Sequence, residues 1–275
     1  MADAAASPLA GKRVVITRTV QQSSELFEKL TCRAAVPILL PLVSFAPPED
    51  YAPLDTALFQ WERFDWVLFT SANAVQAVVA RSTALSRNLH KAGKSAAVAV
   101  VGPGTKGEAE RGGFSIDYVA KTHLGVALAE ELGARLREKN VFLPHSDRAN
   151  PDLPKALRLL GAKLIDVVAY RTLPPADVDR DRVARVLTGE ADALLFFSPS
   201  AVHNFIDLVG CQKLRDLQNN VAVAAVGPVT AAALRDAGVQ RIVMAADTTA
   251  AAVVDSLEEH FAASNRRFTA GAKRE

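Results

Sequence analysis

Short apolar runs rich in β-branched residues alternate with longer stretches of helical period along most of the chain. The runs that each precede a helical stretch are RVVIT (13–17), WVLFT (66–70), VAVVG (98–102), NVFLP (140–144), ALLFF (193–197) and VAVAAVG (221–227). A strand that is apolar on both faces and is followed by a helix is typical of a parallel sheet covered by helices. The alternation therefore predicts an α/β fold with parallel sheets between layers of helices.

Two segments of the first half of the chain recur in the second half. DWVLFTSANAVQAVV (65–79) aligns with DALLFFSPSAVHNFI (192–206), which lies 127 residues further along the chain. VAVVGPGT (98–105) aligns with VAAVGPVT (223–230) at an offset of 125 residues. Two matches at nearly equal offsets indicate an internal repeat. We therefore expect two similar flavodoxin-like α/β domains, each with the same pair of strand-to-helix turns.

Two other segments are long and extended. AVPILLPLVSF (35–45) carries two prolines, which exclude a helix and limit the segment to an edge strand or a connector. AKLIDVVAYRTLPP (162–175) ends in a proline pair. Two such connectors predict that the chain crosses between domains twice. We expect a discontinuous domain made of residues 1–40 and 171–275, and an inserted domain of residues 41–170.

Composition excludes several classes of protein. The hydrophobic fraction is 49% and the net charge is +2, so a nucleic-acid or anionic-membrane surface is not indicated, although a local anion site needs only a few donors. The two cysteines and five histidines show no metal-ligand spacing, and no apolar run approaches the ~18 residues of a membrane span. The opening MADAAASPLAGKR lacks the features of a signal peptide. We expect a cytoplasmic protein with reduced thiols.

Polar side chains begin the helices after two of the repeated strands. FTSANAV places Thr70, Ser71 and Asn73 at one helix start, and FFSPSAV places Ser198 and Ser200 at the other. Ligands of parallel sheets bind at the carboxyl ends of strands, where helix N-termini present free N–H groups. Each residue alone is explained by N-capping, but their paired recurrence favours two anion-binding turns that clamp one ligand across a cleft.

The other repeated turn contains GPGTKG (102–107), which matches the pattern G-x-G-x-x-G. Pro103 removes a backbone donor from this loop, and no acidic residue for ribose follows at the required spacing. The repeat partner GPVTAA (227–232) also lacks the second glycine. We interpret the shared pattern G-P-x-T as a tight turn in which Gly102 and Gly227 precede helices that contain Thr105 and Thr230, not as a dinucleotide site.

Three further residues are candidates for a site. Arg18 ends the first strand, and Arg148 lies in the turn after 140–144; a guanidinium binds carboxylates in a bidentate manner, although either residue could be a solvated surface arginine. Tyr170 lies at the end of the second connector, where it could pack between domains or donate a proton to a leaving group. No Ser-His-Asp order, HExxH, P-loop or CxxC is found.

The ordered set of motifs resembles the uroporphyrinogen-III synthase family. The segments that carry the resemblance are FTSANAV, VAVVGPGT, LPKALRLLGAKLIDVVAYRT, FFSPSAV and VAAVGPVTAAAL, from about Gly11 to His260. Tyr170 falls on the tyrosine that this family places at its cleft.

The resemblance implies a cofactor-free lyase of tetrapyrrole (heme) biosynthesis. Its substrate would be hydroxymethylbilane, which carries eight carboxylates. Loss of the terminal hydroxyl as water gives an azafulvene, the last pyrrole attacks it to form a spiro intermediate, and reclosure inverts that ring. Tyr170 would assist departure of the hydroxyl. The carboxylates would be held by Arg18, Ser71, Asn73, Gly102, Thr105, Arg148, Ser198, Ser200, Gly227 and Thr230.

Three other functions stay open at this point. A two-domain protein that binds a small anion or sugar shares the hinge architecture, and a nucleotide-dependent oxidoreductase or transferase would rely on GPGTKG. A regulatory relative of the enzyme could keep the fold without activity. We expect a monomer that contacts neither nucleic acid nor membrane, and a transient contact with the preceding pathway enzyme is left open.

Overall fold

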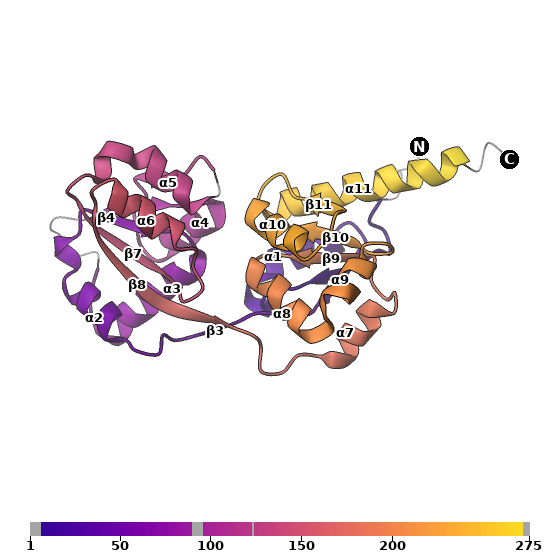
Figure 1. Cartoon of the computed structure of the whole chain (residues 1–275), viewed down its shortest axis with the longest axis horizontal. Helices are drawn as coiled ribbons and strands as arrows, with labels where there is room; N and C mark the ends of the chain where they lie inside the picture. Colours follow the sequence, from indigo (N-terminus) through magenta and orange to yellow (C-terminus); the bar gives the residue numbers. More distant parts are fainter. Residues whose placement is uncertain (1–6, 90–95, 123, 272–275) are drawn as a thin grey trace. The chain divides into compact units, whose positions relative to one another are not determined.

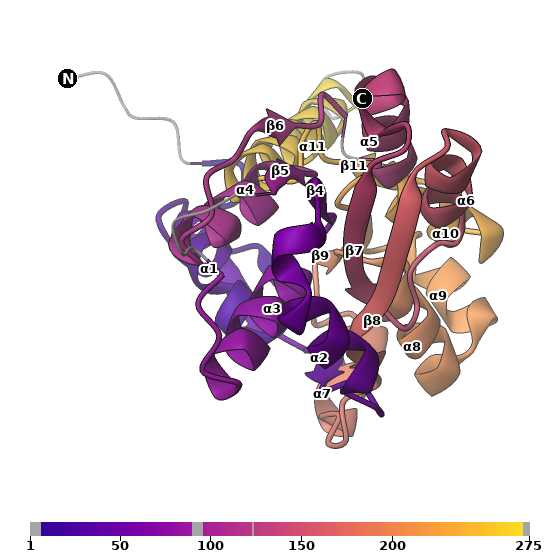
Figure 2. The same cartoon turned by 90° about the vertical axis from the view of Figure 1, so that its left-hand side faces the viewer.

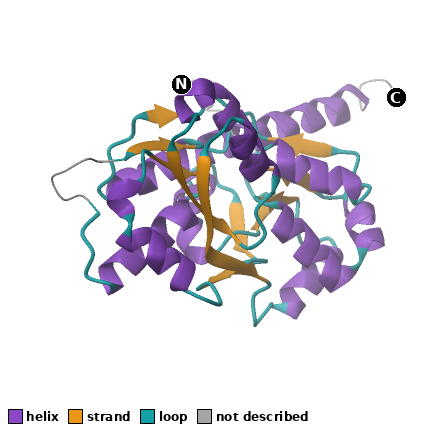
Figure 3. Cartoon of the chain, turned by 60° about the vertical axis from the view of Figure 1, so that its left-hand side comes forward, coloured by secondary structure: helices purple, strands orange, loops and turns teal. Residues whose placement is uncertain are grey.

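The computed structural model describes residues 7–89, 96–122 and 124–271, with side chains up to Ser264. The chain forms two compact units. The discontinuous unit comprises Met1–Ser44 and Pro174–Glu275, and the continuous unit comprises Phe45–Leu173. Both units consist of one sheet between two layers of helices (Figure 3).

The discontinuous unit contains a five-stranded parallel sheet in the order β11-β10-β9-β1-β2, of which Figure 1 labels β11, β10 and β9. Its strands are β1 (Arg13–Ile16), β2 (Val36–Leu39), β9 (Ala193–Phe196), β10 (Ala222–Ala225) and β11 (Ile242–Met244). The four residues of β9 are all buried, because this central strand is covered by helices on both faces. β2 carries Pro37 and lies at the edge of the sheet. A proline has no backbone N–H to donate, and an edge strand tolerates this because one of its sides has no neighbouring strand to bond.

Helices cover both faces of this sheet. On one face, α1 (Ser24–Thr31) and α11 (Ala250–Gly271) pack over residues such as Val14 and Leu195. The helices over the other face are α7 (Arg180–Leu187), α8 (Pro199–Val209), α9 (Cys211–Leu217) and α10 (Pro228–Asp236). A 3-10 turn, η1 (Val20–Gln22), precedes α1.

The continuous unit contains a six-stranded sheet in the order β3-β8-β7-β4-β5-β6 (Figure 2). Its strands are β3 (Ser44–Ala46), β4 (Trp66–Phe69), β5 (Ala97–Val100), β6 (Tyr118–Val119), β7 (Asn140–Ser146) and β8 (Lys163–Leu173). One face is covered by α2 (Ala52–Phe59), η2 (Trp61–Arg63), α3 (Ala72–Ala84) and α4 (Pro103–Arg111). The other is covered by α5 (Gly125–Leu132), η3 (Gly133–Leu136) and α6 (Asp152–Leu159).

The two sheets have the same spatial order, but the chain enters them at different strands. In the continuous unit β6-β5-β4-β7-β8 run side by side, and in the discontinuous unit β11-β10-β9-β1-β2 do so. The repeated segments make β4 equivalent to β9 and β5 equivalent to β10. β1 and β2 therefore occupy the places of β7 and β8, and one unit is a circular permutation of the other.

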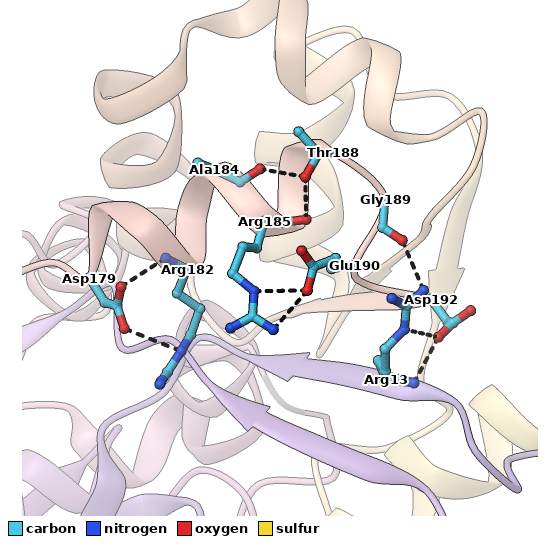
Figure 4. A network of polar contacts seen from close by, with 9 residues as sticks. All are labelled: Arg13, Asp179, Arg182, Ala184, Arg185, Thr188, Gly189, Glu190 and Asp192. Carbon is cyan, nitrogen blue, oxygen red and sulfur yellow. Dashed lines mark hydrogen bonds and ion pairs between the residues drawn. The ribbon is translucent and has the colours of Figure 1, made fainter.

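An aspartate before each central strand marks this equivalence. Asp65 precedes β4 and accepts the backbone N–H of Asn140, at 2.9 Å, on the neighbouring β7. Asp192 precedes β9 and accepts the backbone N–H of Arg13, at 2.8 Å, on the neighbouring β1 (Figure 4). The guanidinium of Arg13 also donates to Asp192 at 3.0 Å. The α/β fold with parallel, helix-covered sheets that the sequence predicts is confirmed.

Candidate functional site

Apart from the edge strand β3, the chain in each sheet first adds strands on one side of its starting strand and then adds the remaining strands on the other side. We call the place between the two strands where this change occurs the reversal point. In the discontinuous unit this point lies between β1 and β9, and in the continuous unit between β4 and β7. Loops at the carboxyl ends of two such strands diverge to opposite faces of the sheet and leave a crevice that is the usual ligand site of open α/β sheets. Arg18 and Ser198 follow β1 and β9, and Ser71 follows β4.

Ser71 and Ser198 are the N-caps of long helices. The Ser71 hydroxyl accepts the backbone N–H of Ala74 at 3.1 Å at the start of α3. The Ser198 hydroxyl accepts the backbone N–H of Ala201 at 3.3 Å at the start of α8. A hydroxyl that accepts an amide proton still has its own proton to donate. The capping role of both serines is therefore observed, and their ligand role stays a prediction.

Ser71 contacts the predicted catalytic tyrosine. The hydroxyl oxygens of Ser71 and Tyr170 lie 3.1 Å apart. The Tyr170 ring packs edge-on against Phe45, with ring centroids 5.7 Å apart. Burial raises the pKa of the Tyr170 phenol, and this effect outweighs the hydrogen bonds from Ser71, Asn73 and Ser146, which lower that pKa. A tyrosine phenol is protonated at neutral pH with or without this shift, so Tyr170 has a proton to donate.

Two residues beside Tyr170 were missed by the sequence analysis. Ser146 and Asp147 lie at the carboxyl end of β7, the other strand at the reversal point. The Asp147 carboxylate accepts the backbone N–H of Thr172 at 2.8 Å, and the backbone N–H of Asp147 donates to the Tyr170 carbonyl at 3.1 Å. The polar run HSD (145–147) directly after the apolar run NVFLP (140–144) marked the end of the strand, but it did not single out Ser146 as the partner of Tyr170.

The repeated G-P-x-T turns have nearly the same backbone geometry. Gly102 has φ 81° and ψ 159°, and Gly227 has φ 99° and ψ 161°. A side chain would strain both positions, because L-residues avoid this region. Thr105 and Thr230 lie one turn into α4 and α10 and are buried, with 6% and 3% of their surface exposed. These threonines offer little surface to a ligand, so the backbone N–H groups of the same turns are the more accessible donors.

Arg18 lies at the reversal point of the discontinuous unit. Its guanidinium stacks on the Phe197 ring, 4.8 Å from the ring centroid. Burial lowers the pKa of Arg18, and the charge of Glu25 raises it by less. Among the described residues, no carboxylate lies within ion-pair distance of Arg18. A partly buried guanidinium without a counter-ion is suited to bind the carboxylate of a ligand.

The structure brings some of the predicted residues together and leaves others apart. Asn73 lies in the first turn of α3 and hydrogen-bonds to Tyr170, which also contacts Ser71. Ser200 lies in the first turn of α8 and is half-buried. Arg148 is exposed, and its backbone N–H donates to the Ser146 hydroxyl at 3.2 Å.

The described residues contain no cluster of three or more histidine, cysteine, aspartate or glutamate side chains that could hold a metal ion. Among the same residues, no helix is both long and apolar enough to cross a membrane. The groups that the structure places at the two reversal points are helix N-termini, a guanidinium and a protonated phenol.

Comparison with known proteins gives the family. The sequence model of uroporphyrinogen-III synthase HemD matches residues 22–255, which is most of the chain. The chain belongs to the uroporphyrinogen-III synthase family. The match includes all of the predicted site residues except Arg18, which lies shortly before it.

Curated relatives and solved structures agree with this assignment. The uroporphyrinogen-III synthase of Synechococcus elongatus is 29% identical over 82% of this chain and 86% of its own length. That of Chlorobaculum parvum is 26% identical over 83% of this chain and 91% of its own length. A mutant uroporphyrinogen III synthase from Thermus thermophilus shares the fold, with a TM-score of 0.63, 20% identity and coverage of 90% of this chain and 98% of that chain. The Helicobacter pylori enzyme superposes with a TM-score of 0.56 at 15% identity, over 89% of this chain and 97% of that chain.

Proposed function

We propose that this chain catalyses the uroporphyrinogen-III synthase reaction in tetrapyrrole biosynthesis. Hydroxymethylbilane would be cyclised with loss of water and inversion of the last pyrrole ring. The observation that carries the proposal is the partly buried Tyr170 phenol, whose oxygen lies 3.1 Å from the Ser71 hydroxyl at the start of α3, in a chain that belongs to this family. The reaction needs one proton donor and a means to hold a polyanion.

Tyr170 would act on the leaving hydroxyl. The phenol donates its proton to the terminal hydroxyl of the bilane, the C–O bond breaks, and water leaves as the electron pair of the adjacent pyrrole forms the azafulvene. The substituted carbon of the last pyrrole then attacks this cation, and the spiro intermediate fragments and recloses with that ring inverted. General acid catalysis of this kind contributes about 10²- to 10⁴-fold to a rate.

The carboxylates of the bilane would be bound by helix N-termini and by Arg18. Ser71 and Asn73 begin α3, Ser198 and Ser200 begin α8, and Gly102 with Thr105 and Gly227 with Thr230 begin α4 and α10. Free N–H groups and the positive end of the helix dipole stabilise an anion at each of these sites. Arg148, exposed in the turn after β7, would reach a peripheral carboxylate.

We infer that the discontinuous and continuous units are the two domains expected from the sequence. Because the bilane also closes unaided to the uninverted ring, the main task is to fix one folded conformation before closure. We propose that a monomer does this in the cytoplasm without a cofactor.

An isomer assay tests the proposed function. Freshly generated hydroxymethylbilane is supplied to the purified protein, the products are oxidised, and uroporphyrin I is separated from uroporphyrin III by chromatography. Mostly type III product supports the proposal. Only type I product, formed at the uncatalysed rate by well-folded protein, refutes it and favours a binding or regulatory relative of the enzyme.

A further inference from the structure

The pairing of β7 with β8 changes register next to Tyr170. The strands pair regularly from Asn140 opposite Lys163 to His145 opposite Val168, and then Ser146 lies opposite Tyr170. One residue of β8, Ala169, is therefore passed over. Bulges are rare between parallel strands and are found next to active sites, where they redirect a side chain.

The bulge changes what Tyr170 can contact. Consecutive residues of a regular strand point to opposite faces of the sheet. Here both Ala169 and Tyr170 pack against the core under α2 and α3, so the bulge turns Tyr170 toward the start of α3. It also aligns Tyr170 with Ser146, which would otherwise lie opposite Ala169.

Ser146 begins a chain of oxygen atoms that ends at a carboxylate. The Ser146 hydroxyl lies 3.0 Å from Oδ1 of Asp147 and 2.9 Å from the hydroxyl of Thr172. Oδ1 of Asp147 is itself fixed by the backbone N–H of Thr172 at 2.8 Å. An ionised carboxylate only accepts hydrogen bonds, so the Ser146 proton points to Asp147 and its oxygen lone pairs stay available to the phenol.

We infer that Ser146 and Asp147 are positioning residues that hold the Tyr170 hydroxyl in place. The inference rests on the role proposed above for Tyr170. Ser146 lies opposite Tyr170 in the pairing of β7 with β8 and acts on the pKa of the phenol as a hydrogen-bond partner, while Ser71 contacts the phenol oxygen at 3.1 Å from the start of α3. Asp147 fixes Ser146 and places a negative charge near the phenol.

The electrostatics of Tyr170 agree with this arrangement. Apart from burial, the Asp147 charge raises the pKa of Tyr170, whereas the hydrogen bond from Ser146 lowers it. Other titratable or charged groups surround this cluster. They include His145 on β7, Arg148 after β7, Arg171 paired with Glu49, Lys163 paired with Glu138, Asp166 paired with Arg158, Asp55 on α2 paired with Arg81 on α3, and Asp152 and Lys155 on α6. Of these neighbours only Asp147 exerts a resolved charge effect on Tyr170.

The test uses the full chain labelled with 3-fluorotyrosine, whose substituent lowers the phenol pKa into a range that folded proteins tolerate. The chain has three tyrosines, so Tyr170→Phe assigns the Tyr170 signal in the ¹⁹F NMR spectrum. The pH midpoint at which the Tyr170 phenol titrates is then measured from this signal in the wild type and in the variants Asp147→Asn and Ser146→Ala. We expect Asp147→Asn to lower the titration midpoint of Tyr170, because it removes a negative charge. We expect Ser146→Ala to raise that midpoint, because it removes a hydroxyl that can turn its proton from Asp147 to the phenolate once the phenol is deprotonated.

Activity provides the second measurement. We expect each variant to lower kcat about 10-fold with KM little changed, since a displaced proton donor affects the chemical step more than binding. Ser146→Thr keeps a hydroxyl at this position and should therefore retain most of the kcat that Ser146→Ala loses. Asp152→Asn removes an exposed carboxylate at the start of α6 and should change neither the midpoint nor kcat.

The outcomes separate this inference from the proposed function. Unchanged midpoints in both variants, or shifts of the same sign, overturn the positioning role even if the enzyme is active. A rise in KM with kcat unchanged in Asp147→Asn and Ser146→Ala overturns it as well. The titration midpoint of Tyr170 could shift in opposite directions in the two variants while Tyr170→Phe keeps the wild-type kcat. That result would support the positioning of the phenol by Ser146 and Asp147 and would overturn the role of Tyr170 in the proposed function. Because Asp147 is exposed, Asp147→Asn keeps the test decisive if Ser146→Ala fails to fold.

Discussion

The hydroxyl of Tyr170 lies 3.1 Å from the hydroxyl of Ser71, which at the same time caps α3 through the backbone N–H of Ala74. One serine thus links the start of a helix to a phenol 99 residues away in the sequence. Ser198 caps α8 in the same way in the other unit. The position there that corresponds to Tyr170 is Val43, a few residues after the end of β2, so no tyrosine occupies the equivalent place. The two units are therefore similar in fold and different in the chemistry they offer.

Tyr170→Phe should lower kcat by about 10²- to 10⁴-fold, as expected for loss of a general acid. The phenol makes a hydrogen bond of the kind worth about 1 kcal/mol, so the fold should persist. Turnover is measured by the isomer assay and folding by circular dichroism. Tyr118→Phe is the matched control, because Tyr118 donates to Glu131 at 2.9 Å in the same unit. Equal rates for wild type and Tyr170→Phe would exclude the acid role.

Arg18→Gln should weaken substrate binding more than it changes kcat. A hydrogen bond to a charged group is worth about 1.5–3 kcal/mol, so we expect KM to rise by roughly 10-fold or more. Glutamine keeps part of the contact with Phe197, which limits the loss of packing. The control is Arg241→Gln, since Arg241 is exposed and donates to Asn219. The same rise in KM for both variants would indicate a general charge effect in place of a site.

Gly102→Ala and Gly227→Ala should each destabilise the protein by about 1–2 kcal/mol, because their φ values of 81° and 99° are unfavourable for L-residues. The Cβ of an alanine at 227 would meet only Thr248, at 3.9 Å, so the expected cost is conformational and not steric. Gly104→Ala is the control in α4. Its Cβ would contact nothing within 4 Å, and we expect it to be neutral or to stabilise by up to about 1 kcal/mol.

These three variants are compared by urea unfolding. A Gly102→Ala protein as stable as Gly104→Ala would mean that the turn relaxes to another conformation. In that case its N–H groups would no longer be directed as the proposed carboxylate site requires.

Asp192→Asn should remove a pH-dependent part of the stability. Burial raises the pKa of Asp192, but the hydrogen bonds from Arg13 and the charges of Arg13 and Lys12 outweigh it and lower the pKa (Figure 4). A carboxyl with a depressed pKa stabilises the fold fully above its ordinary value of about 3.9, and this contribution is lost as the pH falls through the folded value. The free energies of unfolding of wild type and Asp192→Asn should therefore differ most near neutral pH and become similar under acid conditions.

Urea unfolding at several pH values checks this expectation. The control is Asp255→Asn, because Asp255 is exposed and lies 3.7 Å from Arg33; we expect a change within about 0.5 kcal/mol. A difference between wild type and Asp192→Asn that grows on acidification would contradict the expected sign of the pKa shift.

Part of the site was predictable because its signals are local. Ser71 and Ser198 begin helices directly after apolar strands, and Gly102 and Gly227 precede a proline at a first helical position. Caps, turns and strand ends depend on neighbouring residues, so a short window of sequence contains the information. Ser146 was missed since its importance comes from a bulge that changes its partner from Ala169 to Tyr170.

The amino-acid sequence by itself determined the class of fold, the internal repeat and the turns at the carboxyl ends of the strands, because hydrophobic periodicity and turn chemistry act over a few residues. Only the tertiary structure decided that the two sheets are circular permutations of each other, that Thr105 and Thr230 are buried, and that Tyr170 meets Ser71 and Ser146. These features depend on strand order and register between segments far apart in the chain. Such pairing is set by the packing of the whole unit, which no local pattern encodes.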